Sequence, residues 1–230
     1  MGGVGAGRKV VLAAAWLVAA TACGTAAGGE ATLTGPAPPT TPPPPPPRVV
    51  HEQAYTPFAT VGGVTLVHPA ARVERVGFHQ ANHDGARQME TVSTTAAPVV
   101  LEDRQRATGS HTAADVVVDP EAEIRSPVTG RVLRGGGYIL YCRIADDYVV
   151  IEPDERKGWE LKILHIDGLQ VRPGDRVTAG ETVLAPKATR LPFASQVDEF
   201  RTADPAWPHV HIEIVDPSIP DKPNPGGGGC

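Results

Sequence analysis

The chain has few aromatic residues and almost no helical periodicity. Phe, Trp and Tyr make up 5% of its 230 residues, whereas Gly and Pro number 25 and 24. Both residues disfavour the interior of a helix and punctuate turns. Short apolar stretches recur between these turn residues, which is typical of an all-β sheet sandwich or barrel. We expect few or no helices outside the N-terminal segment.

The sequence also lacks a basic surface and a long apolar segment. Its formal net charge is −5, and no cluster of Lys and Arg is interleaved with aromatic residues. This composition argues against nucleic acid as a partner. The apolar run at residues 10–20 is too short to span a bilayer as a stable helix. The length fits one ordinary domain with extensions rather than two clear domains.

Residues 1–22 are predicted to be a lipoprotein signal peptide. Arg8 and Lys9 precede the apolar run, and small residues at 20–22 lead directly to Cys23. The pattern resembles a bacterial lipoprotein signal in which Cys23 is lipidated; the alternative is ordinary secretion that leaves Cys23 free. The expected location is the outer face of the bacterial cytoplasmic membrane, or the exterior if Cys23 is not lipidated.

Residues 23–50 are predicted to be a proline-rich tether. The unbroken proline run at 42–47 favours polyproline II, which extends about 3.1 Å per residue. A spacer of this kind can hold a folded domain away from a membrane anchor.

The three cysteines suggest one disulfide bond. With Cys23 assigned to the lipid, Cys142 and Cys230 remain as a possible pair in an oxidising compartment. The alternative is a buried free thiol at Cys142 and an exposed one at Cys230. Residues 218–230 are predicted to form a Gly- and Pro-rich C-terminal tail.

Residues 51–104 are predicted to be an N-terminal extension with short strands at 61–67 and 73–78. A polar segment follows the second strand and contains His79 and His83, four residues apart, with an adjacent aspartate. This spacing could bind a metal. We expect a surface loop or part of a substrate groove instead, because turn-forming residues dominate the segment and a better metal set lies downstream.

A run of strands is predicted between residues 105 and 217. Asp115 opens an apolar β-branched strand, and residues 138–144 and 148–151 indicate a hairpin with its turn at 145–147. Residues 159–166 form a further strand that carries His165. Near the end of the chain, His209 and His211 alternate along a strand and therefore share one face.

In chain order, His111-x-x-x-Asp115, a lone His165 before a Pro-Gly turn, and His209-x-His211 resemble the lysostaphin/LytM-type zinc endopeptidases of peptidoglycan. The resemblance covers about residues 105–217. It implies an antiparallel sheet sandwich or split barrel. It also implies one Zn²⁺ held by His111, Asp115 and His211, with His165 and His209 as catalytic residues.

Two departures from the family pattern stand out. Ala113 occupies a position that is usually Gly, and the approach to the last strand, residues 187–206, is long. We expect this insertion to reshape the substrate groove. Glu213 lies on the same strand face as His209 and His211, where it could support a ligand or be a solvated charge.

The resemblance implies an exported zinc endopeptidase that hydrolyses peptide bonds in peptidoglycan stem peptides or crosslinks. The alternative is a catalytically inactive relative that binds the wall or activates another hydrolase. A third interpretation is a metal-free surface protein that binds carbohydrate or cell wall through residues 51–100. Stoichiometric zinc would exclude the third interpretation, and hydrolysis of peptidoglycan would separate the first two.

Overall fold

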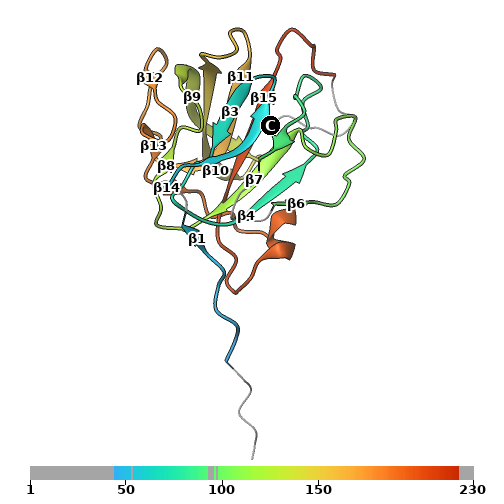
Figure 1. Ribbon diagram of the computed structural model, residues 1–230, viewed down its shortest axis with the longest axis vertical. Helices are drawn as coiled ribbons and strands as arrows, with labels where there is room; N and C mark the ends of the chain where they lie inside the picture. The colour runs from blue at the N-terminus through green and yellow to red at the C-terminus, as the bar shows by residue number, and fades with distance from the viewer. Residues whose placement is uncertain (1–43, 53, 93–95, 97, 223–230) are drawn as a thin grey trace, which may run out of the picture. The chain divides into compact units, whose positions relative to one another are not determined.

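Strands form nearly all the regular structure of residues 44–52, 54–92, 96 and 98–222, which the computed structural model describes (Figure 1). The helix in this part of the chain is a 3-10 helix, η1 (Gln196–Phe200). The predicted all-β class is therefore confirmed: the described residues form mainly antiparallel sheets and contain no α-helix. None of their helices is long and apolar enough to cross a membrane.

A ten-stranded sheet carries the histidines. Its path runs β1-β4-β7-β15-β11-β10-β9-β12, with β14 beside β11 and β6 beside β4. The β4–β6 pair is parallel and the other pairs are antiparallel. The strands are β1 (His51–Glu52), β4 (Arg72–His79), β6 (Pro98–Val100), β7 (Ala113–Val118), β9 (Gly130–Leu140), β10 (Ile144–Pro153), β11 (Glu160–Asp167), β12 (Arg176–Val177), β14 (Lys187–Ala188) and β15 (His209–Val215).

Two smaller sheets complete the architecture. One joins β2 (Pro57–Val61), β3 (Val64–Val67) and β5 (Glu90–Thr91), and the other joins β8 (Ile124–Arg125) and β13 (Val183–Ala185). Alternate apolar side chains of the strands meet in one core, including Phe58, Leu66, Val76, Leu161 and Ile212. Burial of this shared face leaves the opposite face of β4, β7 and β15 to carry polar side chains.

Residues 51–104 are integrated into this arrangement. They supply β1 to β6, and β4 lies directly beside β7 in the large sheet. The described strands all fall within one unit, Pro44–Cys230. A domain boundary near residue 104 stays a prediction. The signal peptide at 1–22 and residues 23–43 of the tether at 23–50 also stay predictions, because residues 1–43 lie outside the part of the chain that the structure describes.

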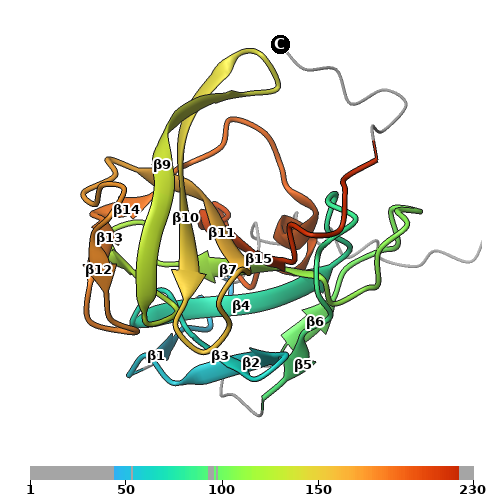
Figure 2. The same cartoon turned by 90° about the horizontal axis from the view of Figure 1, so that it is seen from above.

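The β9–β10 hairpin turns earlier than the sequence predicts. The turn lies at residues 141–143 rather than 145–147, because Leu140 pairs with Ile144. Tyr141 and Cys142 adopt positive φ angles of 50° and 58°. Residues other than Gly and Asn rarely adopt such angles, so the sequence gives no sign of a turn here. In consequence the long hairpin (Figure 2) places Asp146 within a strand instead of in the turn.

Cys142, in this turn, is disulfide-bonded. Its predicted pairing with Cys230 stays a prediction, because Cys23 and Cys230 both lie outside the described residues.

A buried ion pair fastens the chain before β1 to the sheet. Glu74, on β4, pairs with Arg48 and accepts a hydrogen bond from the Thr202 hydroxyl at 2.6 Å. Arg48 also donates to the Ala203 carbonyl at 2.9 Å and lies 4.7 Å from the ring centroid of Trp207. The side chain of Glu74 is 0% exposed, so its charge depends on these partners.

Arg48→Met is expected to lower the free energy of unfolding by about 2–3 kcal/mol, because it leaves a buried carboxylate without its cationic partner. Urea unfolding followed by circular dichroism measures the change. Arg131→Met, on the exposed part of β9, is the matched control and should stay within about 0.5 kcal/mol of the parent. A change of similar size in both variants would contradict the proposed role of the pair.

Candidate metal centre and groove

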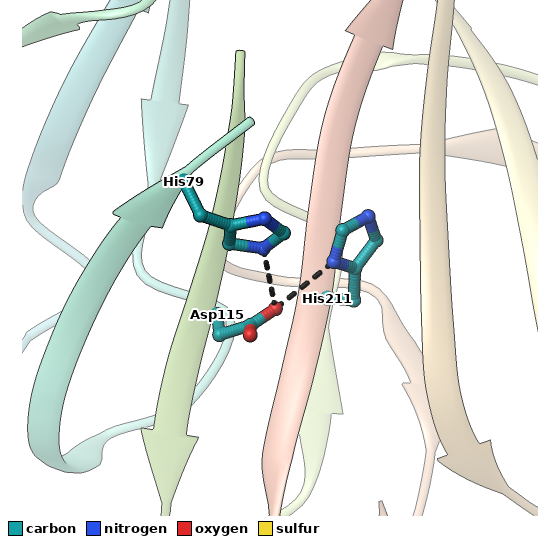
Figure 3. Close-up of side chains that lie close together, drawn as sticks. All are labelled: His79, Asp115 and His211. Carbon is teal, nitrogen blue, oxygen red and sulfur yellow. Dashed lines mark hydrogen bonds and ion pairs between the residues drawn. The ribbon is translucent and has the colours of Figure 1, made fainter. Parts of the chain in front are cut away.

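Neighbouring strands of the large sheet bring the site residues together. β4, β7, β15 and β11 lie in that order, and Asp115 pairs with Gly77 on one side and His211 on the other. His79 is two residues beyond Gly77, so its side chain shares the face of Asp115. The three side chains converge from three adjacent strands (Figure 3).

His79, Asp115 and His211 offer a set of metal ligands. Their ligand atoms all lie within 4.8 Å of one another. Asp115 Oδ1 lies 3.1 Å from His79 Nε2 and 2.9 Å from His211 Nδ1. His79 and Asp115 are buried, at 3% and 4% exposure. Burying a carboxylate costs free energy unless a cation or several hydrogen-bond donors compensate its charge.

The electrostatics of this group favour an ionised Asp115. Burial by itself raises the pKa of that carboxyl, but His209, His79 and His211 outweigh burial and hold the pKa well below its usual value. Burial lowers the pKa of His211, yet the hydrogen bond from its ring to Asp115 and the nearby carboxylate of Glu213 raise it to about 9. The pair is therefore a carboxylate beside an imidazolium in the metal-free protein.

Glu213 supports His211 from its other side. Its Oε2 lies 3.8 Å from His211 Nε2, and its Oε1 lies 3.4 Å from the ammonium of Lys162. Burial raises the pKa of Glu213, but these two partners outweigh it and bring the pKa down to about 2. A carboxylate on the second ring nitrogen fixes the orientation of a ligating histidine. Of the two sequence interpretations of Glu213, the geometry favours support of a ligand.

Binding of a metal ion to this group is expected to release about one proton per chain at pH 7. His211 has a pKa of about 9, and coordination requires a neutral imidazole nitrogen. Below pH 9 the metal must displace that proton, so the apparent affinity should rise about tenfold per pH unit and level off above pH 9. Calorimetry of the chelator-treated protein in buffers of different ionisation enthalpy measures the release. A flat affinity between pH 6 and 8 would contradict this picture.

His111, which the family resemblance implies to be a metal ligand, lies outside the group of His79, Asp115 and His211. A turn precedes β7, in which the Thr112 N–H donates to the Gly109 carbonyl, so the chain is not extended from 111 to 115. The His111 ring stacks on Phe78 with centroids 4.9 Å apart, and its Nδ1 lies 3.0 Å from Ser110 Oγ. His79, expected in a surface loop or in part of a substrate groove, ends β4, lines the groove and lies beside Asp115.

His209 and His165 lie beside the ligand group. His209 Nε2 is 3.9 Å from Asp115 Oδ2, and the rings of His165 and His209 are 5.1 Å apart. Burial lowers the pKa of His209 to about 4, even though Asp115 raises it. His209 is thus a neutral imidazole near pH 7, with a ring N–H that can donate a hydrogen bond.

A β-bulge turns His165 toward the groove. Leu164 pairs with Tyr148 and His211, whereas Ile166 pairs with Asp147, so the register of β10 and β11 shifts at His165. His165 adopts a φ of +64°. A bulge adds one residue and re-aims its side chain. Without it, alternation would direct His165 toward the core, because its neighbour Leu164 already lines the groove.

Asp146 is a site residue that the sequence interpretation missed. Its Oδ2 accepts hydrogen bonds from His165 Nδ1 at 2.7 Å and from the Tyr138 hydroxyl at 2.5 Å, and its Oδ1 accepts one from the Thr189 hydroxyl at 2.7 Å. Burial raises the pKa of Asp146, but these three donors keep it below its usual value. Because Nδ1 of His165 donates to the carboxylate, Nε2 is left as the acceptor.

A groove of about 690 Å³ covers the ligand group and both other histidines. The β9–β10 turn and the long insertion before β15 both line the groove, and the ring centroids of Tyr141 and Phe193 lie 5.7 Å apart where the two segments meet. η1 packs the insertion onto the sheet through Val197, close to Gly77, where a Cβ would lie 2.9 Å from Val197 Cγ2. The insertion thus lines the groove, as its length predicts.

Neither a protein-family model nor a curated protein matches the chain. Among solved structures, a zinc-containing peptidase from Vibrio cholerae is similar over 68% of this chain at 18% identity, with a TM-score of 0.31. This chain spans 42% of that protein. So weak a likeness carries no argument about activity, and the functional assignment depends on the site itself.

Proposed function

We propose that the chain is a zinc endopeptidase that hydrolyses peptide bonds of peptidoglycan at the outer face of the cytoplasmic membrane. The observation that carries the proposal is the group His79, Asp115 and His211 at the floor of a groove that also contains His165 and His209. The choice of peptidoglycan as substrate rests on the resemblance of the ordered histidine motifs to the lysostaphin/LytM type.

The residues present fit a catalytic zinc ion. Two imidazoles and one carboxylate within 4.8 Å of one another satisfy three of the four positions that zinc prefers, as in catalytic rather than structural sites. Glu213 supplies the carboxylate that such ligating histidines usually contact. When bound, zinc polarises a scissile carbonyl and lowers the pKa of water from about 15.7 to about 7.

The other two histidines move protons and contact the substrate. His165 is held by Asp146 with Nε2 free as an acceptor, which suits a general base for the attacking water. The ring of His209 lies 5.1 Å from that of His165, edge to face, and beside Asp115. There it can stabilise the oxyanion or, once protonated, return a proton to the leaving amine.

Location and anchoring remain part of the proposal. Lipid attachment at Cys23 and a proline-rich tether at 23–50 would keep the enzyme at the membrane within reach of the wall.

Purified, zinc-loaded protein should generate new amine termini from isolated peptidoglycan. A chelator should stop the reaction and added zinc should restore it, because the metal supplies the electrophile. The measurement is dinitrophenyl labelling of the released amines. Zinc bound at about one ion per chain without new amines would favour the inactive, wall-binding alternative instead.

A further inference from the structure

The walls of the groove are rich in arginine. Arg104 and Arg106 come from the loop after β6, and Arg143 comes from the turn between β9 and β10. Asp115 and Glu213 are the carboxylates among the groove-lining residues. The groove therefore combines three permanent positive charges with two carboxylates in a chain whose net charge is −5.

Both carboxylates are already engaged by other groups. Asp115 contacts His79 and His211 at 3.1 and 2.9 Å. Glu213 lies 3.4 Å from Lys162 and 3.8 Å from His211. Neither forms an ion pair with an arginine of the groove in the described part of the chain, so the arginine charges stay available to a ligand.

The three arginines differ in how many donors remain free. Arg104 Nε donates to Gln196 at 2.7 Å, and Arg106 Nη1 donates to the Gln80 carbonyl at 2.7 Å. The exposed guanidinium of Arg143 has no hydrogen bond or ion pair with any described residue. Arg143 thus presents its whole fork of donors to the groove, the geometry that matches a carboxylate.

The arginines also lie on opposite sides of the ligand group. The backbone N–H of Arg104 and Nη1 of Arg106 both donate to Gln80, the residue after β4, so these arginines lie at the β4 side of the sheet. Arg143 follows β9, which lies beyond β15, β11 and β10 in the strand order. A peptide laid across the strands would meet positive charge on either side of the bond above Asp115 and His211.

We propose that the groove selects peptides that carry a carboxylate close to the hydrolysed bond, with Arg143 binding that carboxylate and Arg104 reinforcing the field from the opposite end. This specificity rests on the proposed peptidase function, but the recognition step can be measured without hydrolysis. The carboxylate can belong to an acidic side chain or to the end of the peptide.

Three fluorescent peptides of one length separate these sources. The first has an internal Glu and an amidated end, the second has Gln in its place, and the third has Gln and a free terminal carboxylate. Anisotropy is recorded on zinc-loaded protein carrying His165→Ala, so that the peptide is not consumed. We expect the first or the third to bind about 10- to 100-fold more tightly than the second, as a charge-assisted hydrogen bond predicts. Equal affinity for all three would overturn the inference.

Arg143→Gln should reduce the preference for carboxylate by about tenfold or more, and Arg143→Lys should restore part of it. Arg131→Gln is the matched control, because it removes one exposed arginine of β9 that does not line the groove. Equal loss in the Arg143 and Arg131 variants would reduce the effect to net charge and contradict the assignment.

The two hypotheses fail in different ways. Hydrolysis of the acid and amide peptides at the same rate would leave the peptidase function intact and remove the proposed specificity. Preferential binding of carboxylate peptides without hydrolysis of any peptide would support the proposed specificity and contradict the peptidase function.

Discussion

His79→Ala is expected to remove zinc from the protein and to lower peptide hydrolysis by more than about a hundredfold. Loss of a group that merely supports a ligand already reduces metal affinity or activity by about 10- to 100-fold. His79 Nε2 lies 3.1 Å from Asp115 Oδ1 and belongs to the ligand group. Metal analysis after dialysis and turnover on peptidoglycan fragments measure both effects.

His111→Ala is the matched control for this prediction. His111 is also a histidine next to the sheet, but its ring packs on Phe78 and lies outside the ligand group. The variant should keep about one zinc ion per chain and most of its activity. If His111 proved necessary for zinc while His79 was dispensable, the ligand set would be the one that the sequence resemblance implies.

His165→Ala should keep its zinc and still lose about 10²–10⁴-fold in activity, the usual contribution of a general acid or base. His165 lies outside the ligand group, and its ring centroid is 6.2 Å from that of His211. His209→Ala should behave similarly, because His209 also lies outside the ligand group. Loss of zinc in parallel with activity would instead make these histidines ligands.

Asp146→Asn tests how His165 is held. An amide in place of the carboxylate no longer favours the Nδ1–H tautomer of His165, and the wrong tautomer cannot accept a proton at Nε2. We expect activity to fall by about tenfold or more, with zinc retained and a shifted pH profile of kcat/KM. Asp147→Asn, a neighbouring carboxylate that accepts backbone N–H groups of Gly168 and Leu169, should leave the pH profile unchanged.

Much of the fold follows from local patterns. Alternation of polar and apolar residues predicts that His209 and His211 share a face, and in the structure both line the groove while the alternate residues Val210 and Ile212 pack in the core. The strand at 73–78 is also predicted within one residue at each end of β4 (Arg72–His79). Such patterns can be read from the sequence because a strand that is buried on one side has apolar residues at every second position.

The parts that the sequence did not reveal depend on distant pairing or on unusual backbone. His79 reaches Asp115 because β4 pairs with β7, and the spacing of His79 and Asp115 along the chain gives no indication of that pairing. The sequence predicts Asp146 in a turn, because the actual turn uses positive φ angles at Tyr141 and Cys142 and contains no glycine that would indicate it. The bulge at His165 is likewise set by register rather than by residue type.

The most direct test is anomalous diffraction from crystals of the zinc-loaded protein, recorded on both sides of the zinc absorption edge. We predict one strong peak per chain, about 2.0–2.2 Å from a nitrogen of His79, a nitrogen of His211 and an oxygen of Asp115. His165 and His209 should lie close to the peak without coordinating it. A peak coordinated by His111, or no peak beside Asp115, would contradict the account.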